Sequence, residues 1–301
     1  MKEFDDSPNP EFVVIGELLT DVVARTAQQL RYGSDTRATI STHGGGGGAN
    51  TAAWLATGGA TVGFVARVGD DALGRAATLE LLEAGVELHV PIDPVAATGT
   101  CVVIVGPDGE RTMLPDAGAN ANLVPSDLPD QFFRPGAHLH LSGYSLLTPS
   151  SRLAGLAALD LARIRRMTIS VDPASSGPLL DIGPDRFLDW IGGVGLLLAN
   201  EAEACALTGA TDPLAAGQVL ADQFPDVIVK LGSEGAAWFK AKTEPVFSPA
   251  LALSVVDTTG AGDAFAAGLL ATWHSGANVA TTLAVANRTA ALAVSRVGAR
   301  P

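Results

Sequence analysis

The sequence contains little cysteine, no long apolar run and few positive charges, and each shortage excludes a class of protein. Two cysteines in 301 residues, Cys101 and Cys205, offer no disulfide framework and suit a reducing compartment. No apolar run approaches the length that spans a membrane, and the acidic start MKEFDDSPNPE is not typical of a signal peptide. With 19 basic against 32 acidic residues, the formal charge of −13 argues against nucleic acids and anionic membranes as partners. We therefore predict a cytoplasmic globular protein that binds neither nucleic acid nor membrane.

Apolar residues and glycine are abundant, which indicates a large buried core with many tight turns. Hydrophobic residues make up 47% and charged residues 17%, and there are 34 glycines. Apolar strand patterns, beginning at Phe12–Gly16, alternate with helical patterns and predict a mostly parallel sheet. Short alternating strands over 86–115 surround a turn at Pro107-Asp108-Gly109. They predict a small separate sheet, which a strand at 36–42 joins. No interdomain linker appears, so we expect one domain over residues 1–301.

The stretch VVDTTGAGDAFAAG, residues 255–268, carries the clearest chemical signal. An apolar run over 250–256 predicts a strand that ends at Asp257, and Gly260-Ala261-Gly262 leads into an Ala-rich helical pattern. Converging backbone N–H groups and the helix dipole form an anion site at such a turn. Asp263 then places a carboxylate beside the anion, which makes sense if it accepts a proton from a nucleophile while the amides stabilise a transferred group. The alternative is that Asp263 only stabilises the helix N-terminus.

A second glycine-rich segment, HGGGGGAN at 43–50, leads straight into a helical pattern. Five consecutive glycines are typical of a flexible linker, but a linker would not run directly into the helix predicted over 49–57. The glycine backbone and the Asn50 side chain are therefore expected to face one spot. Gly44-x-Gly46-x-x-Ala49 also matches a dinucleotide fingerprint, but the residues before it alternate like an exposed strand rather than a buried first strand.

Polar residues also follow several of the predicted buried strands. Asp21 lies just past the first strand, where ligands bind in open α/β sheets, although a loop cap explains it as well. Asn200 and Glu203 have the spacing of a helix capping box, which is a sufficient structural explanation for both. His138 and His140 point to one side of a predicted strand and, without a metal-type set of partners, are predicted to be packing residues.

Three segments resemble, in order and spacing, the motifs of the ribokinase-like (PfkB) carbohydrate kinases. These are GGGGAN, NEAE and DTTGAGDAF, and the resemblance covers nearly the whole chain. It implies a three-layer α/β/α fold with a mostly parallel central sheet and a small β-sheet lid, which closes over the sugar and often forms a homodimer. It also implies an ATP-dependent kinase that phosphorylates a hydroxyl of a small sugar or sugar-like alcohol.

The resemblance also assigns roles to the residues of the sugar and phosphate sites. Asp263 would be the general base, and the amides of the loop that precedes it would form the anion hole: Gly260, Ala261, Gly262 and Asp263. The residues that would contact the sugar come from the first loop, the glycine-rich segment, the lid and the base itself: Asp21, Gly45, Gly46, Asn50, Cys101, Val103 and Asp263.

The nucleotide and cation sites are implied in the same way. The residues that would contact ATP lie after strands, in the anion hole and on the last helix: Asn200, Lys230, Gly232, Gly260, Gly262 and Asn287. Asn200 and Glu203 would also hold Mg²⁺ through water. K⁺ would bind beside the anion loop at four positions that match those of relatives: Asp257, Thr259, Ala293 and Gly298.

The sequence departs from ribokinases proper at two places in the sugar site. Gly47 stands where they usually carry Lys, and no acidic residue occurs at Ser142–Tyr144, where an acidic sugar ligand often lies. We therefore expect ribose not to be the best substrate. We also expect Asp263, at a helix N-terminus, to have if anything a lowered pKa and to be fully ionised.

Three other functions are compatible with parts of this pattern. A nucleoside kinase would share the fold and the motifs. An NAD-dependent oxidoreductase would require the dinucleotide interpretation of the glycine-rich segment. A non-catalytic sugar-binding protein is the third, but retention of Asp263, Asn200 and Glu203 gives no sign of lost chemistry.

Overall fold

The computed structural model describes residues 9–251 and 254–301 and is organised around a nine-stranded sheet. Seven strands, from β6 to β13 in the sheet order, run parallel, and at the other edge β14 pairs antiparallel with both β13 and β15. In sheet order the strands are β15 (Val246–Ser248), β14 (Ala236–Phe239), β13 (Asp226–Lys230), β12 (Leu196–Asn200), β11 (Thr168–Asp172), β10 (His138–Ser142), β1 (Phe12–Ile15), β4 (Val62–Val65) and β6 (Glu87–His89).

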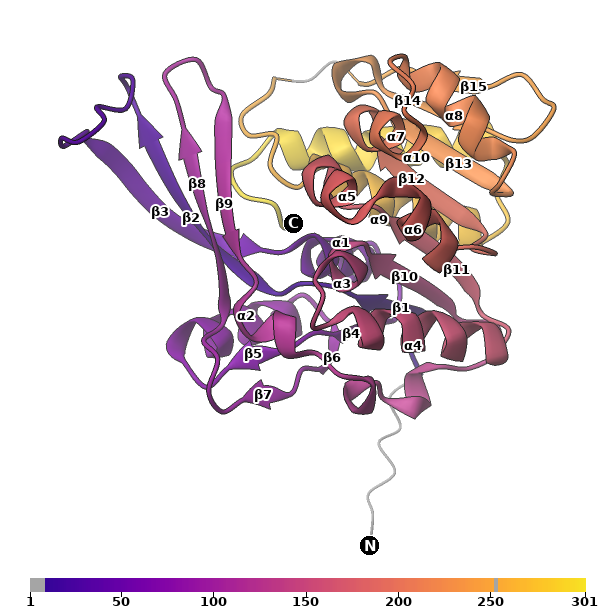
Figure 1. Cartoon of the computed structure of the whole chain (residues 1–301), viewed down its shortest axis with the longest axis horizontal. Coiled ribbons are helices and arrows are strands. Elements are labelled where there is room, and N and C mark those ends of the chain that lie inside the picture. Colours follow the sequence, from indigo (N-terminus) through magenta and orange to yellow (C-terminus); the bar gives the residue numbers. More distant parts are fainter. Residues whose placement is uncertain (1–8, 252–253) are drawn as a thin grey trace, which may run out of the picture.

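Helices cover both faces of this sheet, because its parallel strands are apolar on both sides (Figure 1). One face packs against α1 (Gly47–Thr57), α2 (Ala72–Glu83), α9 (Ala261–His274) and α10 (Val279–Val294). The other packs against α3 (Tyr144–Leu147), α4 (Arg152–Ile164), α5 (Ser176–Ile182), α6 (Pro184–Trp190), α7 (Glu201–Thr208) and α8 (Pro213–Ala221). Along β1, Val13 and Ile15 face one core while Phe12 and Val14 face the other, as the strand period of two requires. The predicted three-layer α/β/α fold is confirmed.

A separate four-stranded sheet, which we call the lid, projects from the body (Figure 1). Its strands are, in order, β3 (Ala38–Gly45), β2 (Leu19–Thr26), β8 (Gly99–Val105) and β9 (Arg111–Asp116). Four turns of 3₁₀ helix connect other elements: η1 (Gly118–Asn122), η2 (Pro125–Asp127), η3 (Asp130–Phe132) and η4 (Gly232–Glu234).

The lid differs from the predicted ranges in two respects. We did not predict β2, although it is the strand that joins β3 to β8 in the lid. The start of the 86–115 range also lies outside the lid, because β6 pairs with β4 in the central sheet. The short strand β7 (Ile92–Asp93) pairs with β5 (Val68–Gly69). Alternation of polar and apolar residues does not reveal which sheet a strand joins.

The strand predicted before Asp257 is not found in the described part of that segment. Residues 252–253 lie outside the described residues, and 254–256 have no strand assignment. The last strand of the sheet, β15, ends earlier, at Ser248. In the described ranges, 9–251 and 254–301, no helix is long and apolar enough to cross a membrane.

Candidate active site

The anion loop lies where the sequence predicts it, at the start of α9. Gly260 is the N-cap residue, in the left-handed conformation (φ 73°), and Ala261 and Gly262 form the first turn together with Asp263. Their N–H groups lie at the positive end of a 14-residue helix, where the Ala261 N–H donates to the Thr258 carbonyl oxygen at 3.3 Å. Asp263 therefore lies in the first turn of the helix, at the end where the helix dipole favours negative charge.

The environment of Asp263 contradicts our expectation that its pKa is low. Desolvation raises the pKa of Asp263 to about 7, and the nearby Asp172 and Asp21 carboxylates act in the same direction. A hydrogen bond from Asn50 and the charge of Lys230 oppose the rise. The helix dipole was the only effect considered from the sequence, and burial among other carboxylates outweighs it.

The glycine-rich segment brings Asn50 to this carboxylate. Asn50 Nδ2 donates to Asp263 Oδ2 at 2.8 Å, so the two motifs meet although 213 residues separate them. Gly46, the N-cap of α1, has φ 96°, and a Cβ there would lie 2.2 Å from the Glu17 carbonyl oxygen. At Gly45 a Cβ would lie 2.2 Å from Asp21 Oδ1. Only glycine lets the backbone pass this close to both groups.

Asp21 belongs to the lid rather than to a loop. It lies on β2 opposite His43 on β3 and Cys101 on β8, so these residues share one face of the lid. Val103 lies two residues further along β8 on that face, and both Cys101 and Val103 are buried. The structure therefore brings Asp21, Cys101 and Val103 together on one surface. Burial raises the pKa of Asp21, and the Arg300 charge opposes that rise.

An acidic group does lie beside Ser142, where the sequence analysis found none. Ser142 Oγ donates to both carboxylate oxygens of Glu17, at 3.2 and 3.1 Å. Glu17 follows β1 and Ser142 ends β10, two adjacent parallel strands, so their ends meet at one edge of the sheet. Burial raises the pKa of Glu17 to about 7. We missed Glu17 because we looked for the acid only in the segment 142–144.

A second missed residue, Asp172, pairs with Lys230 below the anion loop. Lys230 Nζ lies 2.6 Å from Asp172 Oδ2, and both side chains are largely buried. Burial lowers the pKa of Lys230, but the Asp172 and Glu203 carboxylates outweigh this and the net shift is upward, so the lysine stays charged. These groups line one cavity of about 180 Å³ together with Asp263 and Asn200. Asp172 ends a parallel strand, the signal that could have identified it.

Asn200 and Glu203 form the capping box that their spacing predicts. Asn200 Oδ1 accepts from the Glu203 N–H at 2.9 Å, and Glu203 Oε2 accepts from the Asn200 N–H at 2.8 Å. A further bond joins Asn200 Nδ2 to Glu203 Oε1 at 2.7 Å. Burial, and then the charge of Asp172, raise the pKa of Glu203 to about 7. The capping box thus fixes a buried acidic group at the wall of the cavity that holds Asp263.

Four of the six predicted nucleotide residues line a larger cavity of about 530 Å³, whereas Asn200 lines the smaller cavity and Gly260 lines neither. The lining of the larger cavity includes Lys230, Gly232, Gly262 and Asn287. Asn287 is buried, and its Nδ2 donates to the Ser248 and Pro249 carbonyl oxygens, both at 3.1 Å. Asn287 thereby holds the wall of this cavity in place.

Asp257 is engaged by two arginines of the lid. Arg25 Nη2, from β2, lies 3.1 Å from Asp257 Oδ2, and Arg111 Nη1, from β9, lies 3.6 Å from Asp257 Oδ1. Arg111 also donates to the hydroxyls of Thr258 and Thr259. We call these contacts the lid latch. Burial raises the pKa of Asp257, but hydrogen bonds from Thr259 and Gly298 and the charge of Arg25 give a net lowering.

The four positions proposed for K⁺ partly converge on this carboxylate. Thr259 N donates to Asp257 Oδ1 at 3.0 Å, and Gly298 N lies 3.4 Å from Asp257 Oδ2. The Asp257 N–H points to the carbonyl of Val294, the residue after Ala293. Since the arginines already balance the Asp257 charge, backbone carbonyls are the remaining ligands that this region offers a monovalent cation.

The histidine pair is part of the packing, as predicted. His138 and His140 are buried on β10, and both share Ser170 Oγ, at 2.7 and 2.8 Å. Burial lowers the pKa of His140 to about 4 and that of His138 well below its usual range, so both are neutral at pH 7. His140 also lines the smaller cavity, whereas the other ring nitrogen of His138 lies 2.8 Å from Thr168 Oγ1.

The third missed residue is Arg300, next to the last residue of the sequence. Its side chain is buried and donates to Asn50 Oδ1 at 3.2 Å, so it completes a chain of contacts from Arg300 through Asn50 to Asp263. Nothing in the local sequence around Arg300 points to this contact, because its partners lie about 220 to 255 residues away.

Comparisons with known protein families, sequences and structures agree with one another. A family profile described as pfkB family carbohydrate kinase matches residues 9–301. An ATP-dependent ribose-1-phosphate kinase of Halopiger xanaduensis is 34% identical over 261 residues, 85% of this chain and 82% of that protein. The structure is similar to that of an adenosine kinase from Sinorhizobium meliloti, with TM-score 0.87, 27% identity and coverage of 98% and 96% of the two chains.

A third similar structure was solved with ligands. It is a fructokinase from Vibrio cholerae with fructose, ADP and a calcium ion, at TM-score 0.81 and 28% identity, covering 96% of this chain and 94% of that one. A double mutant of that fructokinase was solved with fructose, ADP and a potassium ion. These three relatives act on, or are bound to, a sugar phosphate, a nucleoside and a free hexose, according to their names.

Proposed function

We propose that this chain, which belongs to the pfkB family of carbohydrate kinases, transfers the γ-phosphoryl group of ATP to a hydroxyl of a small sugar or sugar-like alcohol. The observation that carries the proposal is the position of Asp263. Its carboxylate is held by Asn50 from the glycine-rich segment and lies one residue after Gly262, which lines both the smaller and the larger cavity. A group placed there faces a sugar on one side and a nucleotide on the other.

The reaction needs a base, an anion hole and aligned substrates. The hydroxyl oxygen attacks the γ-phosphorus, the bond from that phosphorus to the bridging oxygen of ADP breaks, and the hydroxyl proton passes to Asp263. Amides of Gly260–Asp263 at the positive end of α9 stabilise the transferred group, and Lys230 adds a fixed positive charge on the same side. A carboxylate with a pKa of about 7 is a stronger proton acceptor than an ordinary one and is still largely ionised just above neutrality.

Asn200 and Glu203 would hold Mg²⁺ through water. Within the described ranges, no group of three or more His, Cys, Asp or Glu side chains is arranged to bind a metal ion directly. Both Glu203 oxygens already accept hydrogen bonds from Asn200, which leaves them as acceptors for metal-bound water rather than as inner ligands. Such oxygen groups suit Mg²⁺, because this ion loses its bound water reluctantly and is usually held by a few carboxylates together with the phosphates of the substrate. When bound, the ion neutralises phosphate charge.

K⁺ is proposed as a second cation, bound by carbonyl oxygens beside the anion loop. The proximity of Thr259 and Gly298 to Asp257 supports the position. The arginines of the lid latch already balance the charge of the Asp257 carboxylate. Replacing K⁺ by tetramethylammonium at fixed Mg²⁺ should lower activity. Unchanged activity would remove K⁺ from the proposal.

The charges on the sugar side favour an uncharged polyol over a sugar phosphate. Carboxylates of Asp21, Glu17 and Asp263 surround this region, and the nearby Arg300 is paired with Glu80. Carboxylates accept hydrogen bonds from sugar hydroxyls but repel a phosphate. Glu17 also supplies the acid that we thought was missing, which weakens the argument from Ser142–Tyr144 against ribose. The departure at Gly47 remains, and we still expect ribose not to be the best substrate.

The lid is proposed to form a homodimer interface and to belong to a single kinase domain over residues 1–301. The face of the lid opposite Asp21 carries Val22, Ala24, Ile40, Val102 and Leu114, according to the strand register. Ile40 and Leu114 are 66% and 55% exposed, so this apolar face is available for a second copy. Cytoplasmic location is proposed from the cysteine content alone.

Two measurements test the proposal. ATP consumption is screened against pentoses, hexoses, keto-deoxy acids, nucleosides and ribose 1-phosphate. Nucleosides as the best substrates would favour a nucleoside kinase, and preference for ribose 1-phosphate would overturn the charge argument. Asp263→Asn should then lower kcat on the best substrate by about 10²–10⁴-fold, because the amide cannot accept a proton. Near-wild-type turnover in that variant would refute Asp263 as the base.

The pH profile provides an independent check of the same role. With a pKa of about 7, Asp263 is protonated and inactive at lower pH, so kcat/KM should fall as pH decreases through about 7. An ordinary carboxylate would keep activity constant down to about pH 4. The melting temperature of Asp263→Asn should be no lower than that of the wild type, because Asn can still accept from Asn50, occupies the same volume and carries no buried charge.

A further inference from the structure

Arg300 joins three parts of the molecule that are far apart in sequence. Its side chain is 5% exposed. Nε donates to Asn50 Oδ1 on α1 at 3.2 Å, Nη2 to the Gly45 carbonyl at the end of β3 at 2.8 Å, and Nη1 to Glu80 Oε2 on α2 at 2.7 Å. A planar guanidinium with its donors engaged in three directions has a fixed position and orientation.

This contact determines which end of the Asn50 amide faces the base. Asn50 has one acceptor atom and one donor group, and the two ends touch Arg300 and Asp263 respectively. In the reversed orientation, the Asn50 oxygen would face the Asp263 carboxylate and its NH₂ group would face the guanidinium. Both contacts would be repulsive. The charge on Arg300 thus selects the orientation in which Asn50 donates to Asp263.

We propose that Arg300 is a positioning residue for phosphoryl transfer, which acts on Asp263 through Asn50 and on the sugar-binding backbone through Gly45. The inference rests on the proposed role of Asp263 as the base. Arg300 contacts neither the transferred group nor the reacting oxygen. Its effect is to hold the Asp263 carboxylate in one rotamer and the Gly45 backbone beside Asp21, so that the base and the sugar are aligned before reaction.

The course of the chain near Arg300 does not depend on the arginine side chain. Trp54 Nε1 donates to the Ala299 carbonyl at 2.9 Å, and Ala299 is 1% exposed. The Arg296 guanidinium also lies over the Trp54 ring, 5.5 Å from its centroid. The segment is therefore anchored next to Arg300 by other contacts, so substitution of Arg300 should leave the fold intact.

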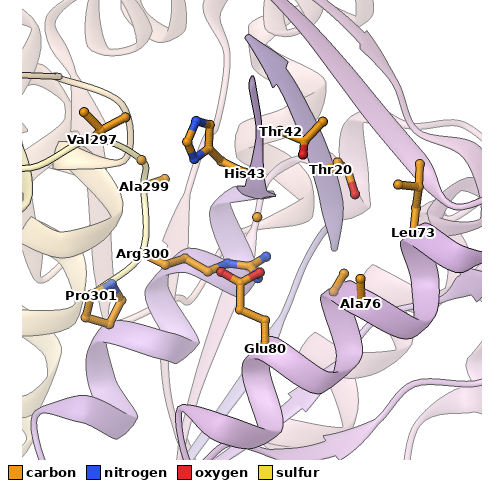
Figure 2. Close-up of a pocket in the computed structure, with 13 residues that line it drawn as sticks. Thr20, Thr42, His43, Leu73, Ala76, Glu80, Val297, Ala299, Arg300 and Pro301 are labelled. Atoms are coloured by element: carbon orange, nitrogen blue, oxygen red, sulfur yellow. The ribbon is translucent and has the colours of Figure 1, made fainter. Parts of the chain in front are cut away.

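A cavity between the lid, α2 and the segment 297–301 gives small molecules access to Arg300. Figure 2 shows the Arg300 guanidinium beside the Glu80 carboxylate, with His43 and Thr42 of β3 and Leu73 of α2 around the same space. The cavity volume is about 380 Å³. If Arg300 is shortened, a small guanidinium ion can enter through this cavity and take the place of the lost group.

The first experiment is chemical rescue of Arg300→Ala. We expect kcat to fall by about 10²-fold, the cost typical of a misplaced catalytic group. Methylguanidinium should restore a substantial part of that loss, whereas urea, which has the same shape but no charge, should not. Arg296→Ala is the matched control, an arginine of the same segment without contact to Asn50, and it should keep near-wild-type kcat. Unchanged kcat in Arg300→Ala, or equal rescue by urea, would overturn the proposal.

The second experiment tests whether Arg300 acts through Asn50. In an Asn50→Ala background, Arg300→Ala should cost far less than in the wild type, since the residue that it orients is gone. Full additivity of the two losses would overturn the proposed route. If Arg300→Ala does not fold, Arg300→Lys serves in the same cycle. Lysine keeps the charge, but its compact ammonium group cannot reach the Asn50, Gly45 and Glu80 oxygens together as the planar guanidinium does.

Outcomes with Asp263→Asn separate this inference from the proposed function. Loss of turnover in Asp263→Asn with normal kcat in Arg300→Ala would leave Asp263 as the base and overturn the role of Arg300. Normal turnover in Asp263→Asn would overturn the base assignment itself, and with it the inference about Arg300.

Discussion

The two halves of the proposed active site are built in different ways. The nucleotide half consists of short local motifs at helix N-termini, such as the Asn200–Glu203 capping box and the helix start at Gly260. The sugar half is assembled from distant segments: Asp21 from the lid, Asn50 from α1 and Arg300 from near the C-terminal end. The first half is fixed by backbone geometry, whereas the second depends on long-range side-chain contacts.

This difference indicates how each half of the site should respond to substitutions elsewhere in the chain. A local capping box needs only two residues three positions apart, so the geometry survives changes elsewhere in the chain. The sugar half needs Arg300, Asn50 and Asp263 to meet, and the latch residues Arg25 and Arg111 connect it to the anion loop. We therefore expect a substitution in the nucleotide half to change the binding of one ligand only. A substitution in the sugar half should also change the binding of ligands that it does not contact.

The largest effect among the predictions that test this comparison is expected for Glu203→Gln. Glutamine can still bond to the Asn200 N–H, but it lacks the charge that attracts a hydrated Mg²⁺. The Mg²⁺ concentration needed for half-maximal activity should rise by about 10–100-fold, while KM for the sugar changes little. The measurement is a Mg²⁺ titration at saturating ATP and sugar.

The matched control for this prediction is Glu201→Gln. Glu201 is an exposed carboxylate in the same first turn of α7, outside the capping box. Its variant should show a normal Mg²⁺ requirement. A change in sugar KM as large as the change in Mg²⁺ requirement for Glu203→Gln would show that the two halves are not separable.

A smaller effect, spread over both halves, is expected for Arg111→Met in the lid latch. Methionine keeps the aliphatic bulk but loses the contacts with Thr258, Thr259 and Asp257, so the lid is held less firmly against this segment. Since Arg111 is 30% exposed, the loss should be modest, with KM for the sugar and for ATP both rising by about three- to tenfold.

The control for the latch is Arg31→Met in the β2–β3 connection. The Arg31 guanidinium donates to Gln28 within the lid, and the variant should leave both KM values unchanged. The KM values come from initial rates with each substrate varied in turn. If Arg111→Met changes only the KM for ATP, the latch belongs to the nucleotide half and does not couple the nucleotide and sugar halves.

The same distinction explains what the sequence could predict. The helix start at GAGD, the capping box and the alternation of buried strands are local patterns, and the structure has them where the residues predict them. The roles assigned to the individual site residues remain predictions. The unpredicted parts depend on tertiary contacts: β2 joins the lid, Glu17 meets Ser142 across two strands, and Arg300 reaches Asn50 over 250 residues. The pKa of Asp263 was mispredicted for the same reason, because burial and the charges of Asp172 and Asp21 cannot be read from its neighbours in sequence.

The last prediction concerns stability rather than activity, in Glu17→Gln, and it isolates the sugar half from catalysis. Burial raises the pKa of Glu17 from 4.5 to about 7 in the folded protein. Between these two pH values the folded state keeps a proton that the unfolded state releases, so this group makes the free energy of unfolding decrease as pH rises. Above pH 7 the Glu17 carboxylate is ionised in the folded protein although it is buried. Glutamine carries no charge at any pH and can still accept from Ser142.

The melting temperature of Glu17→Gln relative to the wild type should therefore increase between pH 5 and pH 8.5. The pKa difference of about 2.5 units (7 minus 4.5) sets an upper limit of about 3 kcal/mol on this change, a shift of several degrees for a chain of this size. Other buried carboxylates, including Asp263, are present in both proteins and largely cancel from the difference. Equal melting temperatures for Glu17→Gln and wild type at both pH values would mean that Glu17 is ionised at no cost and that the sugar half is more polar than its buried geometry implies.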